Sequence, residues 1–346
     1  FENCSKNNFY FTVNNWETKQ KVFEGYLYNS SMYKESQEPK NNFKKNLGNK
    51  YIVDEGITTI SKSINLFNKE IIFKANSKIC LINGATLSLI KSNISFDGSS
   101  SNKVEIFGCD KKNGSVIIKD SKININHLVI NNLTAPDNAL NILYGGLNVI
   151  NSDLNFDYIG IRNSQSEDGV NFIDSRIIGK TLDVTNIKSD AIDSDFSQLT
   201  VDNIKCSNIG NDCLDLSGSL SKIKYLNAEG VKDKVISAGE SSILSANSIV
   251  AKNSEIGIVS KDSSIVDISS FLFANVKLPL TSYIKKVELS SPTLRIKKIR
   301  PINIDKTFLS IDSNIYIGGK KIKGLRSSKE INDLLYGNIY GEKTKR

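Results

Sequence analysis

The stretch that decides the fold is SDAIDSD (189–195) together with GNDCLDLSGS (210–219), two segments that align with each other. VKDKVISAGESS (231–242) and SEIGIVSKDSS (254–264) continue the series at a spacing of 21 to 22 residues. Such a period is typical of solenoid proteins, whose repeats are too small to bury an apolar side alone and must stack on one another. The spacing predicts an all-β chain that forms a single-stranded right-handed parallel β-helix, with roughly one coil per repeat.

The alignment can be followed in columns. One column holds Asp168, Asp190, Asp212, Asp233 and Glu255, at steps of 22, 22, 21 and 22 residues. Two positions further along come Val170, Ile192, Leu214, Val235 and Gly257, and two further still Phe172, Ser194, Leu216, Ser237 and Val259. Side chains alternate between the two sides of a strand. We therefore expect Ile192, Leu214, Val235 and Val259 to be buried, and Asp193 and Asp215 to be exposed.

The pattern divides the chain into three parts. Residues 1–50 are rich in aromatic and charged residues and lack the period, so we expect an N-terminal cap or an appended segment. Residues 51–320 should form the β-helix. Residues 321–346 should contain a short helix over 328–335, with Ser327 or Ser328 as its N-cap, and a basic tail. The chain has no run of 18 apolar residues, so no membrane-spanning helix is expected.

The net charge is +8 and the pI is near 9.0. This balance favours an acidic partner, and we expect an anionic polysaccharide. Nucleic acid is not expected, because the basic residues are scattered and no aromatic and basic platform is visible. The alternative is an ordinary solvated, lysine-rich surface. With such a partner, we expect the protein to be extracellular or at the cell surface.

The five cysteines show no metal-binding spacing. Their number is odd, so they cannot all pair within the chain. Cys206 and Cys213 could be small buried fillers rather than reactive groups. The redox compartment stays open at this point.

At its most regular coils the chain resembles a family of bacterial right-handed β-helix domains, some of which occur beside spore-coat H-type kinase domains. The resembling segments are EDGVNF (167–172), SDAIDSDFS (189–197), IGNDCLDLSGS (209–219), DKVISAGESS (233–242), IGIVSKDSS (256–264) and TSYIKK (281–286). They cover roughly residues 140–290. The resemblance implies the fold, while the family has no settled activity that it could lend to this chain.

A looser resemblance is to pectin-degrading inverting hydrolases of the polygalacturonase type. It places Asp190 on the aspartate of their Asn-Thr-Asp motif, Asp212 in their Asp-Asp-Cys motif, and Lys261 near their Arg-Ile-Lys motif. The aspartate that serves these enzymes as the acid is Asn211 here, which cannot donate a proton in general acid catalysis. The histidine motif is missing too, because the only histidine, His127, lies in an earlier coil. The resemblance implies a shared architecture, with the hydrolase machinery lost or never present.

The aspartate column offers distances that suit glycosidases. Adjacent coils lie about 4.8 Å apart, so Asp190 and Asp212 would be separated by one such step, and Asp168 and Asp212 by two. These separations fall near the retaining and inverting ranges respectively. A glycoside hydrolase that depends on Asp190 or Asp212 is therefore one hypothesis, and the resemblance to polygalacturonase-type enzymes implies an inverting one. The alternative is that these carboxylates cap turns and accept backbone N–H groups.

Three further aspartates, Asp193, Asp195 and Asp215, should point outward and cluster over two coils. Like charges at that spacing repel, so a Ca²⁺ ion, a proton or a nearby lysine should offset them. They are the predicted metal ligands, and Ca²⁺ is the predicted ion.

Later coils carry lysines on the same side. A lyase or C5-epimerase acting on uronates needs a neutralised sugar carboxylate, a base for the C5 proton and an acid for the leaving oxygen. Lys261 or Lys285 could be the base and Tyr283 the acid. The predicted substrate-binding residues are Lys234, Glu240 and Lys286. The alternative is a salt-bridge network on a non-catalytic carbohydrate-binding, adhesive or structural surface protein.

Overall fold

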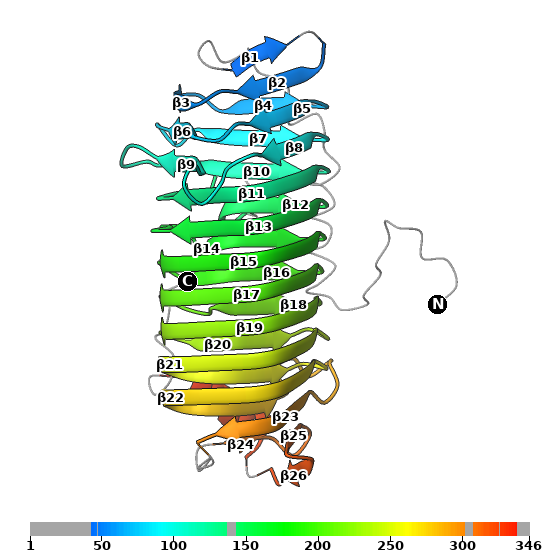
Figure 1. Ribbon diagram of the computed structural model, residues 1–346. Coiled ribbons are helices and arrows are strands. Elements are labelled where there is room, and N and C mark those ends of the chain that lie inside the picture. The colour runs from blue at the N-terminus through cyan, green and yellow to red at the C-terminus, as the bar shows by residue number, and fades with distance from the viewer. Residues whose placement is uncertain (1–42, 47, 137–142, 302–306, 325, 338–346) are drawn as a thin grey trace, which may run out of the picture. The chain divides into compact units, whose positions relative to one another are not determined.

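The computed structural model describes residues 43–46, 48–136, 143–301, 307–324 and 326–337, which belong to one compact unit. These residues form a parallel β-solenoid of about 11 turns that winds in a right-handed sense (Figure 1). The predicted fold class is confirmed. The predicted N-terminal cap falls almost wholly on residues 1–42, which lie outside the described residues, and the strands begin at Phe43.

Each coil contributes a strand to each of three faces. On face 1 the separate strands are β2 (Lys50–Val53), β5 (Glu70–Phe73), β8 (Asn93–Phe96) and β25 (Asn314–Ile317). On face 2 they are β3 (Gly56–Ile60), β6 (Ser77–Leu81) and β9 (Val104–Gly108). Long strands bend from face 1 to face 2: β11 (Lys122–Asn131), β13 (Asp153–Arg162), β15 (Arg176–Ile187), β17 (Gln198–Ile209), β19 (Leu220–Val231) and β23 (Thr293–Arg300).

Face 3 closes each coil and carries the residues that the sequence analysis singled out. Its separate strands are β4 (Ile64–Phe67), β7 (Thr86–Ile90), β10 (Ser115–Lys119), β12 (Gly145–Ile150), β14 (Asp168–Ile173), β16 (Asp190–Asp195), β18 (Leu214–Ser217), β20 (Lys234–Gly239) and β24 (Phe308–Leu309). Two strands, β21 (Ile243–Lys261) and β22 (Ile265–Tyr283), run over all three faces and end on face 3.

The two ends of the described solenoid differ from its parallel coils. β1 (Phe43–Asn46) pairs antiparallel with β2, and β26 (Lys320–Ile322) pairs antiparallel with β25. The helix α2 (Ser328–Leu335) follows, as predicted. Ser327 is its N-cap and forms a capping box with Glu330, because each side chain bonds the other residue's backbone N–H.

The register of face 3 differs from the predicted one at a single step. Leu214 lies opposite Ile236 rather than Val235, so the period there is 22 residues and not 21. Lys234, and not Asp233, therefore continues the column of Asp190 and Asp212. The sequence alignment matched acid to acid, whereas face 3 keeps a step of 22 residues from Val170 to Leu280.

The four side chains expected to be buried, Ile192, Leu214, Val235 and Val259, are all fully buried. Val259 is buried differently from the other three. It belongs to a small apolar cluster with α2, outside the main core. Of the pair expected to be exposed, Asp193 and Asp215 are half-buried, so that prediction is only approximately right.

Internal ladders hold the corners of the coils in register. A buried serine occupies the corner after face 3 in successive coils, and its hydroxyl accepts the N–H of the serine in the preceding coil. Ser197, Ser219 and Ser242 form part of this ladder at 3.0 and 3.1 Å. At the corner after face 2, asparagines adopt positive φ and their side chains bond from coil to coil, as Asn186 does with Asn163 at 3.1 Å.

Two disulfides are present among the described residues: Cys80–Cys109 joins adjacent coils, and Cys206–Cys213 lies within a single coil. Cys206 and Cys213 are buried, as the suggestion that they are small fillers required, but they are bonded to each other rather than separate side chains. Cys4 lies outside the described residues. In the part of the chain that is described, no helix is long and apolar enough to cross a membrane.

Candidate functional site

The residues predicted to be functional share the outer side of face 3, here called the polar face. A bend at the start of each strand creates it. At this bend two consecutive residues, such as Ala191 and Ile192, both point into the core. The residues on either side of the pair, such as Asp190 and Asp193, therefore both point outward. Three outward columns result: Asp168–Asp190–Asp212–Lys234–Ile256–Leu278, Asn171–Asp193–Asp215–Ser237–Val259–Thr281, and Ile173–Asp195–Ser217–Gly239–Lys261–Tyr283.

In the first column the carboxylates of Asp190 and Asp212 each bond the next coil. Asp190 Oδ1 accepts the N–H of Asp212 at 2.7 Å and the amide of Asn211 at 2.8 Å. Asp212 Oδ1 accepts the N–H of Lys234 at 2.8 Å. Burial and the neighbouring Asp212 carboxylate raise the pKa of Asp190 well above its usual range. The column is thus a hydrogen-bonded spine along one edge of the polar face.

The acidic end of the polar face is organised by an amide. Asn171 Nδ2 donates to Asp168 at 3.0 Å and to Asp193 at 3.2 Å, and joins the first two columns. Burial, and then the Asp195 carboxylate, raise the pKa of Asp193. Asp193 lies opposite Asp215 on the adjacent strand. Among the described residues, Asn171 Oδ1 and Asp215 Oδ1 are buried oxygens without a hydrogen-bond partner.

Lys234 marks the change from acidic to basic residues. Its ammonium lies 2.5 Å from Asp233 and 3.4 Å from Asp212. Burial alone would lower the pKa of Lys234, but the Asp212 and Asp233 carboxylates outweigh it and raise the pKa. Burial raises the pKa of Asp212 to about 7, against the opposing effect of Lys234. Within this buried pair Asp212 is therefore the group whose pKa lies near neutral pH, whereas the raised pKa of Lys234 keeps its ammonium charged.

Lys261 lies flat against the polar face. Its ammonium is 3.0 Å from the hydroxyl of Ser237, which belongs to the preceding coil. The side chain passes over Gly239, where a Cβ atom would come within 2.7 Å of Lys261 Cε. Burial would lower the pKa of Lys261, but Tyr336, Asp215 and Glu240 more than compensate and raise it. Glycine at 239 is therefore what lets the Lys261 ammonium reach back toward Asp215.

Two acidic residues position the last lysines. Glu240 accepts from Ser217 at 3.0 Å and forms an ion pair with Lys286 at 2.6 Å. Asp262 Oδ1 accepts the backbone N–H groups of Lys285 and Lys286 at 2.6 and 2.8 Å. The segment after β22 is thus tied to the preceding coil, with both lysines at the edge of the polar face.

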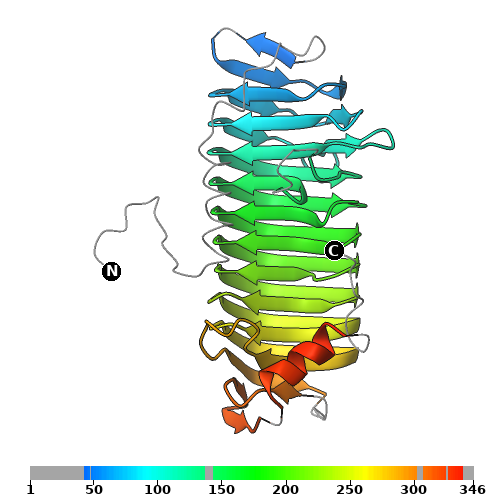
Figure 2. The ribbon, with the colours of Figure 1, turned by 180° about the vertical axis from the view of Figure 1, so that it is seen from behind.

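Helix α2 covers the far end of the polar face, as the view from behind in Figure 2 shows. Ile331 and Leu335 pack on a patch formed by Ile256, Val259, Leu278 and Tyr283. Tyr283 is 0% exposed. Its hydroxyl lies 3.5 Å from that of Tyr336, the residue that follows α2. A polymer on the outside of the protein does not reach Tyr283 in this arrangement.

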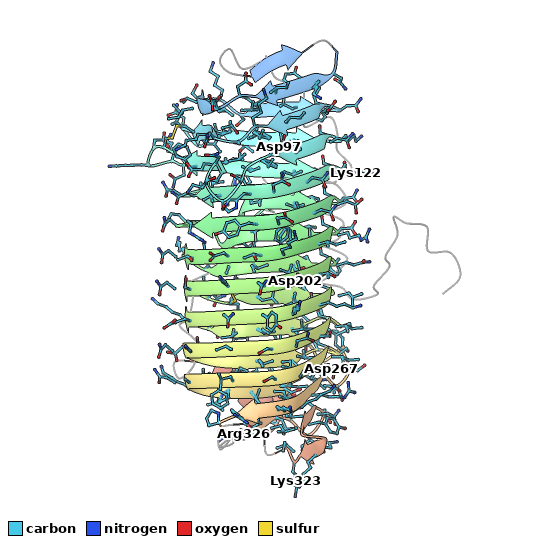
Figure 3. The ribbon with its side chains drawn as sticks, in the orientation of Figure 1. Asp97, Lys122, Asp202, Asp267, Lys323 and Arg326 are labelled. Atoms are coloured by element: carbon cyan, nitrogen blue, oxygen red, sulfur yellow. A yellow bond between two sulfur atoms is a disulfide. The ribbon has the colours of Figure 1, made fainter. Side chains whose placement is uncertain are left out.

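The structure therefore brings the eleven predicted residues to one face and grades them from acidic to basic. It does not bring them into one deep cleft. Two shallow hollows lie elsewhere, on face 1, and one of them is lined by Asp267, Arg295 and Tyr316. Figure 3 shows Asp267 with Asp202 on the side opposite the polar face.

The arrangement of the three predicted metal ligands gives Ca²⁺ no direct support. Among the described residues, no group of three or more His, Cys, Asp or Glu side chains is placed to hold a metal ion. Asp193 and Asp215 lie opposite each other, and Asp195 lies opposite Ser217. The Ca²⁺ site stays a prediction.

Sequence reasoning gave no role to five residues that build the site: Asn171, Ser237, Gly239, Asp262 and Tyr336. The 22-residue register could have found the first three, because each lies in an outward column. Nothing in the sequence could have found Tyr336, which reaches the site only because α2 folds back onto face 3.

No protein-family model matches the sequence, and no curated protein matches it. Among solved structures, the chain is similar to a double mutant of the periplasmic alginate epimerase AlgG, with a TM-score of 0.36 and 11% identity over 81% of this chain and 80% of that one. It is also similar to the catalytic domain of a GH87 alpha-1,3-glucanase in complex with tetrasaccharides, with a TM-score of 0.34 and 10% identity over 85% of this chain and 63% of that one. Likeness at this level concerns the fold alone and carries no argument about function.

Proposed function

We propose that this protein binds a polysaccharide along the polar face. The observation that carries the proposal is a continuous row of carboxyl, amide, hydroxyl and ammonium groups over successive coils. Asp193, Asp195 and Asp215 are half-buried, so part of each side chain in this row stays accessible to a ligand. Sugar hydroxyls both donate and accept hydrogen bonds and can pair with such groups.

The expected polymer is anionic. The protein carries a net charge of +8, and Lys285 and Lys286 border the polar face. The acidic residues oppose such a ligand less than their number suggests, because burial raises the pKa values of Asp168, Asp190 and Asp193. A carboxyl group whose charged form is disfavoured by burial repels an anionic ligand less.

Binding without catalysis fits these contacts better than the enzyme hypotheses do. Tyr283 is enclosed beneath α2, which argues against its use as a general acid. The Asp190 and Asp212 carboxylates are engaged by backbone N–H groups, which favours the spine over the hydrolase role. The two disulfides suit an oxidising compartment and support an extracellular or surface location.

The test is a binding panel of uronate polymers and neutral glucans, measured by calorimetry at low and at physiological ionic strength. We expect salt-sensitive binding of a uronate polymer. Ser237→Ala and Asp215→Ala should each weaken it about tenfold, or roughly 1.4 kcal/mol. Asp202→Ala, an exposed carboxylate on another face, is the matched control. If no polymer binds, a structural or assembly role becomes the better account.

The same polymers test the enzyme alternatives. A lyase would form an unsaturated product that absorbs in the ultraviolet, and Lys261→Ala or Tyr283→Phe should abolish it. A hydrolase would release reducing ends without that absorbance and would depend on Asp190 or Asp212. An epimerase would incorporate solvent deuterium at C5. Any of these activities would replace the binding proposal.

A further inference from the structure

Two lysines on the polar face make no direct ion pair with another described residue. Lys234 pairs with Asp212 and Asp233, and Lys286 pairs with Glu240. Within the described residues, neither Lys261 nor Lys285 makes an ion pair. Lys261 is only 6% exposed, and its one hydrogen bond there goes to a neutral hydroxyl. Asp215 and Glu240 stabilise this ammonium without touching it, so the place still favours a negatively charged group in direct contact with it.

Tyr336 occupies that place. The Lys285 ammonium lies 4.6 Å from the centre of the Tyr336 ring, and the Lys234 ammonium lies 5.4 Å from it. Burial would raise the pKa of the Tyr336 phenol, but Lys261, Lys234 and Lys285 outweigh burial and lower it. At Tyr283, by contrast, burial prevails over the nearby lysine and raises the pKa of the phenol. The surroundings of Tyr336 therefore stabilise negative charge at its oxygen.

We propose that Lys261 and Lys285 form a subsite for one carboxylate of an anionic polysaccharide, and that Tyr336 holds this subsite in the free protein. The identity of the polymer rests on the proposed function, while the subsite rests on the two unpaired ammonium groups. Asp215 Oδ1, close enough to raise the pKa of Lys261, is the acceptor for a hydroxyl of the same sugar. A uronate unit carries both groups.

Tyr336 is placed so that a ligand can displace it. It is 37% exposed and directly follows α2, whose anchoring side chains are Ile331 and Leu335. The phenol can therefore leave while the helix stays in place. The lysines do not follow it, because Asp262 holds the N–H of Lys285 and Ser237 holds the ammonium of Lys261.

The decisive experiment uses protein labelled with ¹³C at the tyrosine ring and follows the Tyr336 resonance, assigned from Tyr336→Phe. Free glucuronate and an oligogalacturonate are the probes, and a neutral maltooligosaccharide is the control. We expect both acidic probes to shift this resonance, and Lys285→Met to abolish the shift. Lys298→Met, an exposed lysine on face 2, should leave it unchanged. If neither acidic probe moves the Tyr336 signal, the proposal is overturned, whether or not a polymer binds elsewhere.

Calorimetry supplies the second arm. Tyr336→Ala removes the competing group, so oligogalacturonate should bind several-fold more tightly, whereas Lys285→Met should bind about tenfold more weakly. Equal affinities of wild type and Tyr336→Ala would overturn the displacement. Loss of all polymer binding in wild type, with the glucuronate shift retained, would instead remove the proposed function and leave the carboxylate subsite.

Discussion

The Asp190 carboxylate accepts the backbone N–H of Asp212 from the next coil at 2.7 Å. Hydrogen bonds from a side chain to the next coil's backbone are repeated by Asp212 and by the serine ladder. They couple successive coils at the edge of the polar face, in addition to the strand pairing itself. The Asp190 carboxylate can therefore stabilise the fold without taking part in catalysis. Mutations that measure stability and activity separately can distinguish these two roles.

Asp190→Ala should lower the free energy of unfolding by about 1–3 kcal/mol, because it leaves the buried N–H of Asp212 without an acceptor. Asp190→Asn keeps an acceptor oxygen and should cost less. Urea unfolding measures both. Asp202→Ala, on an exposed position, should stay within about 0.5 kcal/mol of wild type. If Asp190→Ala lowers the free energy of unfolding by no more than Asp202→Ala does, the Asp190 carboxylate does not stabilise the contact between coils.

Stability should fall as the pH rises from about 4.5 to about 7. Burial raises the pKa of Asp212 to about 7 in the folded protein, while an unfolded aspartate titrates near 3.9. Between these values the folded state binds more protons than the unfolded state, so raising the pH favours unfolding. Asp168, Asp190 and Asp193 act in the same direction. Glu240, whose pKa is lowered, acts oppositely below about pH 4.5, outside this window.

The variant Asp212→Asn tests this dependence of the unfolding free energy on pH. The substitution should flatten the dependence of the unfolding free energy on pH by up to about 1.4 kcal/mol per pH unit between about pH 5 and 6, and by about half as much at pH 7. The measurement is the urea midpoint across the window, with Asp202→Asn as the control that keeps the wild-type slope. A midpoint that rises with pH in wild type would show that the sign is wrong.

Gly239→Ala should push Lys261 away from Ser237, because the new Cβ would lie 2.7 Å from Lys261 Cε. Overpacking of this kind costs about 1–3 kcal/mol. In a Lys261→Ala background the clash disappears, so a double-mutant cycle should show strong coupling. Additive effects in thermal melts would mean that Gly239 does not accommodate the lysine.

If Asp193, Asp195 and Asp215 bind Ca²⁺, millimolar Ca²⁺ should raise the melting temperature above that in chelator, because a ligand of the folded state stabilises it by mass action. Asp193→Asn should remove the increase. Identical melting with Ca²⁺ and with chelator would rule out a stabilising site at these three residues.

Much of the fold was predictable, for local reasons. The 22-residue period and the alternation of apolar residues indicate stacked coils, and Ser327 with Glu330 indicates the start of α2. The register error at Asp233 came from matching like residues. The chain instead places Lys234 there, where its N–H meets the Asp212 carboxylate.

The sequence alone determined the β-helix, the outward columns of face 3 and the gathering of carboxylates and lysines there. The reason is that a repeat of fixed length places equivalent residues of successive coils side by side. Only the tertiary structure decided which of these groups are buried, paired or covered. Tyr283 and Lys261 lie in one column by register, yet their burial depends on α2, which is distant in sequence. Burial and long-range contacts set charge states and access, and no periodicity in the sequence encodes where a terminal helix will dock.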